Sequence, residues 1–214
     1  SEFIGQDNTG FVVGIDGTIE AVGSESEPIL FRGEDDIRGF WTGIEINSNS
    51  TKNIFDNVIV KNGGARGFSA ASPANLLIRD IGRLELKNSE LLKSGDYGLV
   101  IEDLRGLIPV FEKNTITNNA RSIECKMQHF HYFDTESDLT GNDEDVIETT
   151  WSDKLSDEDV TWKNTGVPFK ITKAEVIASA ISINPGVELI FTDDSGLAVT
   201  EEGSFIAEGS SEEP

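Results

Sequence analysis

The stretches LKNSELLKSGDYGLVI at residues 86–101 and FEKNTITNNARSIEC at residues 111–125 carry the same pattern one after the other. Each has an apolar residue, an asparagine, a short strand-like run, a polar turn and a second strand-like run. A looser copy, FDNVIVKNGG, lies at residues 55–64, so successive copies begin 31 and 25 residues apart. This spacing fits three short strands and three turns, and it predicts a coil that repeats along the chain.

The remaining apolar residues also fall in short runs bounded by Gly, Asn, Asp and Ser, which is a strand pattern. We therefore predict an all-β protein, a right-handed single-stranded parallel β-helix (a solenoid) with one lateral loop excursion. The predicted strands are residues 11–13, 18–22, 29–31, 43–46, 57–60, 75–78, 83–86, 98–101, 115–117 and 122–125. In this fold Asn57, Asn88 and Asn114 are expected to stack as a structural ladder at a single turn.

The end of the chain repeats its beginning. Residues 189–214 align without a gap on residues 3–28, and ten of the twenty-six aligned positions are identical. Such a match is typical of repeat architectures and suggests one period of a longer array. We expect one domain, residues 1–214, with four parts: residues 1–28 as the tail of a preceding unit, 29–125 as central coils, 126–168 as a lateral insertion, and 169–214 as the start of the next unit.

Three motifs resemble the right-handed parallel β-helix modules of bacterial secreted proteins and surface lipoproteins. Residues 17–31 match G-x-x-x-A-x-G-[ST]-x-x-x-P-I-x-F, residues 41–44 match W-x-G-I, and residues 53–64 match N-x-x-D-x-V-x-V-x-x-G-G. Residues 161–210 are similar to the point where such proteins restart a module. The resemblance implies a fold and an extracellular or bacterial cell-surface location, but no common chemistry.

Composition restricts the partners. With 39 acidic and 17 basic residues the formal net charge is −22, which disfavours binding to nucleic acid and to anionic lipid. The single cysteine, Cys125, excludes an internal disulfide, and no apolar run is long enough to cross a membrane, so we expect no direct membrane insertion. We expect no cofactor, with weak calcium binding by acidic patches as the alternative.

Aromatic residues in polar surroundings are the candidates for stacking on a sugar ring: Trp41, Tyr97, Trp151 and Trp162. For Trp41 packing is the competing interpretation, and for Trp151 and Trp162 it is that they cover the side of the β-helix. Tyr97 is expected to be the more exposed. His129 and His131 are two residues apart, so on a strand they would face one side and, with Asp134, form a candidate metal site. A surface histidine pair without metal is the alternative.

No catalytic centre is evident. The Gly-His-Gly and Arg-Ile-Lys elements of β-helix hydrolases are absent, and the acidic run at residues 34–36 is typical of a solvated turn. A basic row on one face (Lys61, Arg66, Lys87, Lys93 and Arg121) would suit a polysaccharide lyase or epimerase acting on an acidic glycan, which is the alternative function. The preferred function is non-enzymatic: a spacer or binding module that contacts a polysaccharide or a surface protein. End-to-end self-association is expected if open strand edges lie at the two ends.

Overall fold

The protein is built almost entirely from parallel β-strands. The computed structural model describes residues 1–149 and 159–210. Every ladder between strands in these ranges is parallel. The prediction of an all-β protein with parallel strands is therefore confirmed.

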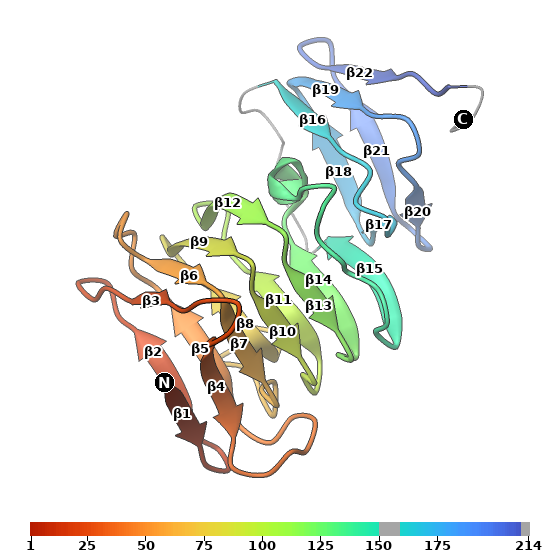
Figure 1. Ribbon diagram of the computed structural model, residues 1–214. Coiled ribbons are helices and arrows are strands. Elements are labelled where there is room, and N and C mark those ends of the chain that lie inside the picture. Colours follow the sequence, from red (N-terminus) through yellow and green to blue (C-terminus); the bar gives the residue numbers. More distant parts are fainter. Residues whose placement is uncertain (150–158, 211–214) are drawn as a thin grey trace.

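In the N-terminal part the chain passes through three sheets in turn. The strands are β1 (Glu2–Gly5), β2 (Gly10–Val13), β3 (Glu20–Val22), β4 (Ile29–Gly33), β5 (Gly43–Ile46), β6 (Ile54–Asp56), β7 (Val58–Lys61), β8 (Ala74–Ile78), β9 (Arg83–Lys87), β10 (Glu90–Leu92), β11 (Tyr97–Ile101), β12 (Leu107–Glu112), β13 (Thr115–Thr117) and β14 (Arg121–Cys125). Each strand pairs with the strand three places further along, in the orders β1-β4-β7-β10-β13, β2-β5-β8-β11-β14 and β3-β6-β9-β12. We call one pass through three sheets a circuit; the circuits stack side by side (Figure 1).

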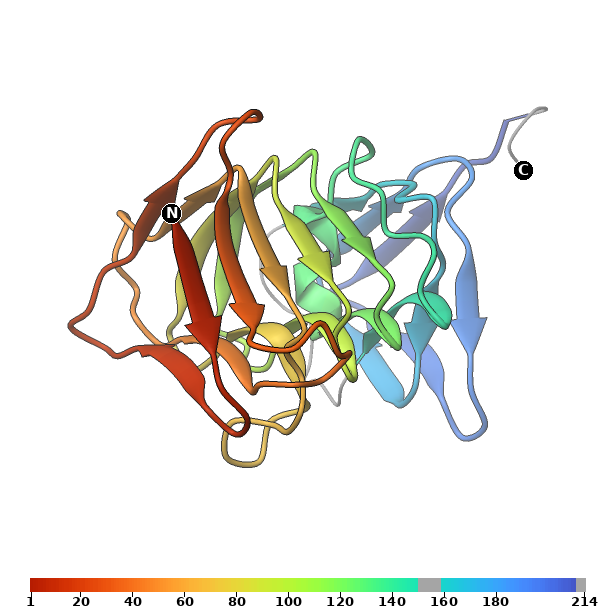
Figure 2. The same cartoon turned by 60° about the horizontal axis from the view of Figure 1, so that its bottom comes forward.

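The C-terminal part adds strands to the second of these sheets and forms two further, smaller sheets. Its elements are the 3-10 helix η1 (Met127–Tyr132) and the strands β15 (Glu144–Thr149), β16 (Val160–Trp162), β17 (Phe169–Ile171), β18 (Ala174–Ile177), β19 (Ala180–Ile183), β20 (Leu189–Phe191), β21 (Gly196–Val199) and β22 (Ser204–Ala207). Strands β15, β17 and β20 bring the second sheet to eight strands, while β16-β19-β22 and β18-β21 form two smaller sheets. Helix η1 contacts β12 on one side and β16 on the other. Figure 2 shows the stack from the N-terminal to the C-terminal circuits.

The core is a set of apolar rows that cross the eight-stranded sheet. Because side chains alternate between the two faces of a strand, residues in register on neighbouring strands form rows. The inward row contains Ile44, Leu76, Leu99, Ile123, Ile147, Phe169 and Leu189, and all but Leu189 are at most 1% exposed. In the next row the side chains point outward. On β14, β15 and β17 this row is charged, with Glu124, Glu148 and Lys170 in register. Short alternating strands therefore suffice to bury a continuous core.

Buried asparagines tie successive circuits together, but they are not those predicted. Asn75 donates from Nδ2 to Oδ1 of Asn119 at 3.2 Å, and Asn119 donates in the same way to Asn142 at 3.0 Å. Asn119 also accepts from the backbone N–H of Ser94 and donates to the carbonyl of Leu91. These bonds satisfy backbone groups that the turns leave unpaired in the interior.

The predicted ladder of Asn57, Asn88 and Asn114 is wrong at its third member. Asn57 and Asn88 each follow a strand and have positive φ, and both donate to the carboxylate of Asp56. The residue at the same place in the next circuit is Lys113, with φ of 53°, because Lys87 pairs with Glu112. Asn114 is one residue further on, where its amide bonds to Ser89 and Leu86.

The predicted lateral insertion is also wrong for the described part of residues 126–168. Strand β15 lies within the eight-stranded sheet, between β14 and β17. Phe130, Phe133 and Trp162 belong to the main core, and each is fully buried. The repeating pattern of the sequence is interrupted in this segment because η1, and not a strand, lies beside β12. The segment nevertheless remains part of the stack of circuits.

Candidate functional site

Two of the four aromatic residues predicted to bind sugar are buried inside the core. Trp41 is 3% exposed, and its indole N–H donates to the carbonyl of Lys61 at 2.8 Å. Trp162 is fully buried against Phe130 and Phe169. A ring enclosed in this way cannot stack on a ligand, so the binding prediction is wrong for both residues. Trp151 lies outside the described residues.

Tyr97 is also buried, although it lies on the outer face of the eight-stranded sheet. The side chain is 1% exposed, and it packs with Ala71, Leu77 and Phe68 in a small cluster. The guanidinium of Arg121 covers the ring at 4.0 Å from its centroid. The expectation that Tyr97 is exposed is therefore wrong, because residues 62–73 between β7 and β8 contribute side chains that cover this part of the sheet.

The predicted metal site does not form from His129, His131 and Asp134. The two histidines lie on η1, where residues two apart point in different directions, and not on a strand. Asp134 accepts hydrogen bonds from the backbone N–H groups of Lys113 and Ser137. Among residues 1–149 and 159–210, no group of three or more His, Cys, Asp or Glu side chains is placed to hold a metal ion.

Helix η1 instead forms one wall of a cavity of about 860 Å³. Three aromatic rings follow one another along the helix: Tyr132 lies 4.1 Å from His131 and 5.9 Å from His129, measured between ring centroids. The cavity also receives side chains from the segment around β12 and from residues around β16. The other residues that line it include Leu104, Leu107, Gln128, Asp159, Val160 and Lys163.

His129 is the most unusual group in this cavity. Its side chain is 1% exposed, and neither ring nitrogen has a hydrogen-bond partner of normal geometry among the described residues. Burial lowers the pKa of His129 to about 3, and the neighbouring carbonyl of Leu104 opposes the shift only in part. The ring is therefore neutral at physiological pH, with one N–H donor and one nitrogen acceptor, both enclosed in the wall.

The neutral state of His129 predicts a pH-dependent stability. The unfolded chain binds a proton at a pKa near 6.5, whereas the folded chain does so only near pH 3, so stability falls as the pH drops through this window. Between pH 7 and pH 5 this group should lower the free energy of unfolding by about 2 kcal/mol. The measurement is urea unfolding at both pH values for the native chain and for His129→Phe, which lacks the titration. Equal losses in the two proteins would contradict the assignment.

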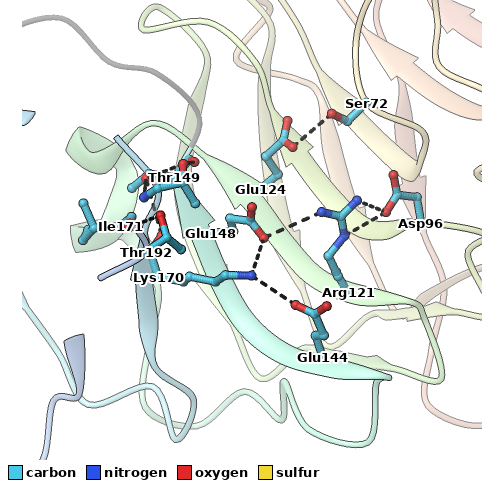
Figure 3. A network of polar contacts seen from close by, with 11 residues as sticks. Ser72, Asp96, Arg121, Glu124, Glu144, Glu148, Thr149, Lys170, Ile171 and Thr192 are labelled. Atoms are coloured by element: carbon cyan, nitrogen blue, oxygen red, sulfur yellow. Dashed lines mark hydrogen bonds and ion pairs between the residues drawn. The ribbon is translucent and has the colours of Figure 1, made fainter. Parts of the chain in front are cut away.

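A second polar region covers the outer face of the eight-stranded sheet (Figure 3). Arg121 on β14 binds Asp96 and lies 3.7 Å from Glu148 on β15, while Lys170 on β17 binds both Glu148 and Glu144. Arg121 thus joins carboxylates of two circuits, whereas both carboxylates beside Lys170 belong to β15. Three carboxylates share two cations, so the network joins neighbouring circuits and leaves this part of the face negatively charged.

Glu124 lies beside this network but is held differently. Burial raises its pKa, although hydrogen bonds from Ser72 and Tyr97 oppose the shift. The Ser72 hydroxyl donates to Glu124 at 3.0 Å (Figure 3). Burial also raises the pKa of Tyr97, and the nearby charges of Glu124 and Glu148 add to the effect. Burial therefore favours the protonated form of both groups.

The basic row expected of a lyase does not form. Lys61, Lys87 and Arg121 belong to β7, β9 and β14, which lie in three different sheets. Lys61 and Lys93 both pair with Asp36, and Lys87 pairs with Asp56. Arg66 donates to the carbonyl of Asn8. The prediction of one basic face is wrong, because these basic residues lie on different sheets of the stack although they occupy similar places in the sequence pattern.

Comparison of the chain with models of protein families, with curated proteins and with solved structures gives no match. Of the residues that line the cavity, sequence reasoning had identified only His129 and His131, and for a different role. The dense aromatic run HFHYF at residues 129–133 was the available signal. Leu104, Leu107 and Lys163 carry no local signal, since only the stacking of circuits brings them to η1.

Proposed function

We propose that the protein is a right-handed parallel β-helix that acts as an extracellular or cell-surface binding module for neutral glycans. The three sheets visited in turn by successive circuits support the solenoid part of this proposal. The observation that carries the binding part is the cavity beside η1, with the half-buried rings of His131 and Tyr132 in its wall.

The chemistry of the cavity fits a ligand rich in hydroxyl groups. Gln128, Asp159 and Lys163 place amide, carboxylate and ammonium groups in its wall, and a hydroxyl group can bond to any of them because it both donates and accepts. Leu104, Leu107 and Tyr132 supply apolar surface for the C–H face of a sugar ring. The volume of about 860 Å³ lies within the range of small-molecule sites.

The charge of the chain favours neutral over acidic ligands. The formal net charge of −22 repels a polyanion such as a uronic-acid polysaccharide. No helix among the described residues has the length and apolar character needed to cross a membrane. A neutral polysaccharide is therefore the partner that the cavity and the charge jointly support.

The test is retention of the native chain by immobilised neutral glucan, mannan and galactan, with polygalacturonate and alginate as acidic competitors. We expect retention by at least one neutral polymer and none by the acidic ones. Tyr132→Ala should weaken binding about tenfold or more, because it removes a half-buried ring from the cavity wall and with it about 1.5–3 kcal/mol of apolar contact. Ile37→Ala is the control, since Ile37 is exposed in the loop between β4 and β5.

Three outcomes would overturn this proposal. Equal binding by the native chain and by Tyr132→Ala would show that the cavity does not bind the glycan, and retention by none of the neutral polymers would show that there is no such binding. Ultraviolet absorbance of unsaturated sugar products, measured in the same samples with an acidic polymer, would replace a binding module with a lyase.

A further inference from the structure

A second cavity, of about 390 Å³, lies at the corner where the chain leaves the sheet β3-β6-β9-β12 for the sheet that contains β7, β10 and β13. Three of the residues that line it directly follow β6, β9 and β12: Asn57, Asn88 and Lys113. All three have positive φ, between 47° and 54°. The same turn is therefore repeated in three successive circuits, and the cavity extends across all of them.

Strand β12 joins this second cavity to the cavity beside η1. Leu107, the first residue of β12, lines the cavity beside η1, and Lys113, which follows its last residue, lines the second cavity. Six residue steps along a strand place the two ends roughly 20 Å apart. Helix η1 follows the same course beside β12 (Figure 1). Gln128 near its start donates to the carbonyl of Leu104. Asp134, just beyond its end, accepts from the N–H of Lys113.

The outer face of β12 between the two cavities is apolar. Leu107 is 39% exposed, Pro109 is exposed and Val110 is half-buried. Ile108 and Phe111 point the other way, into the core. A strip of apolar surface therefore connects one cavity to the other, and it is suited to the C–H faces of sugar rings.

The polar groups of the second cavity include two amides that are held in place. Asn57 and Asn88 each donate from Nδ2 to the carboxylate of Asp56, at 2.9 and 2.8 Å. An amide has a second N–H and an oxygen besides, and Thr115 adds a hydroxyl group to the wall. These groups can bond to the hydroxyl groups of a sugar, as the polar groups of the cavity beside η1 can.

The charge of the second cavity also favours a neutral ligand. Its wall contains the carboxylates of Glu25 and Glu90 and the ammonium group of Lys113. With two carboxylates and one cation, the cavity does not attract an acidic polymer.

We infer that one neutral polysaccharide chain lies along β12 and occupies both cavities. This inference rests on the proposed binding beside η1 and extends it to a second contact at Asn57 and Asn88. A distance of roughly 20 Å along the strand exceeds the length of a disaccharide. The complete site therefore takes several consecutive sugar units and distinguishes a polymer from its short fragments.

Contact at both ends makes the affinity depend on the length of the sugar chain. Once one part of the chain is bound beside η1, another part is held near the second cavity at a high effective concentration. We expect a hexasaccharide to bind about tenfold or more tightly than a disaccharide of the same polymer. The measurement is titration calorimetry of the native chain with di- and hexasaccharides of glucan, mannan and galactan.

Two variants test the path of the sugar chain. Asn88→Gly removes an amide from the second cavity and keeps the positive φ, so the ratio of disaccharide to hexasaccharide dissociation constants should fall about threefold or more. Pro109→Asp places a carboxylate on the apolar strip, where a bound sugar would remove it from water, and it should lower the same ratio.

Asn118→Gly is the matched control. Asn118 is an exposed asparagine with φ of 59° that follows β13, at a different turn from those that line the second cavity. This variant should keep the ratio of the native chain.

Three outcomes would overturn the inference. They are equal affinity for the two lengths, equal effects of Asn88→Gly and Asn118→Gly, and an unchanged ratio in Pro109→Asp, which would indicate two separate ligands. Each of these leaves the proposed function standing if Tyr132→Ala still weakens binding. Retention by none of the neutral polymers would overturn both proposals, so the two failures are distinguishable.

Discussion

Replacement of Gly43 by alanine is expected to destabilise the fold by about 3–5 kcal/mol. Gly43 begins β5 with φ of 112°, a conformation that L residues rarely adopt. A Cβ atom there would lie 2.3 Å from the carbonyl oxygen of Ala74 and 2.8 Å from that of Asn75. These are backbone atoms of the neighbouring circuit, so they cannot move aside without disturbing the eight-stranded sheet.

Gly166→Ala separates the two causes. Gly166 also has positive φ, 77°, but nothing lies within 4 Å of its Cβ position. This variant should lose only the conformational term, about 1 kcal/mol. Urea unfolding of both variants gives the comparison. Equal losses of stability in the two variants would contradict this explanation, because they would show that the close contact between circuits at Gly43 adds no cost to alanine.

Asn119→Ala should cost about 3 kcal/mol or more. Asn119 is fully buried, and its amide bonds to Ser94, Leu91, Asn75 and Asn142. Alanine would leave the N–H of Ser94 and the carbonyl of Leu91 without these partners in the interior. Thermal and urea unfolding measure the loss, and faster hydrogen exchange at the Ser94 amide would locate it.

Asn88→Gly is the matched control for this prediction. Asn88 is exposed and adopts φ of 47°, which glycine tolerates, so the variant should change stability by a few tenths of a kcal/mol. A loss of similar size in both variants would show that the buried ladder contributes no more than a surface turn.

The strands of the N-terminal part could be predicted because their local signals are strong. Every strand expected between residues 11 and 125 overlaps a strand of the structure. Short apolar runs that alternate with polar residues, bounded by Gly and Asn, are sufficient for this purpose. β1, β6, β10 and β12 were missed, since three of them span only three or four residues and Pro109 interrupts β12.

The ladder was misplaced because the spacing of asparagines alone does not fix register. Asn114 resembles Asn57 and Asn88 in sequence, but pairing of Lys87 with Glu112 puts Lys113 at the equivalent turn. Asn75 belongs to β8, but its side chain accepts a hydrogen bond from the backbone N–H of Gly63, in the segment that follows β7. Such a contact depends on how circuits stack, which a local pattern does not encode.

The candidate site was only partly visible in the sequence for the same reason. Trp162 was a candidate for sugar binding or for covering the side of the β-helix, yet it lies on the inward face of β16 within the core. His129 and His131 were recognised as unusual, but a strand was assumed where a 3-10 helix forms. The cavity forms because η1, and not a strand, lies between β12 and β16, and no short motif in the sequence predicts this helix.

The most direct test is NMR of the two imidazole rings, since His129 and His131 are the only histidines in the chain. The binding account predicts that the nitrogen signals of His129 remain those of a neutral ring down to about pH 4, and that the ring signals of His131, which is half-buried in the cavity wall, shift when a neutral oligosaccharide of the binding polymer is added. A His129 ring that titrates near pH 6.5, or signals that the saccharide leaves unchanged, would contradict it.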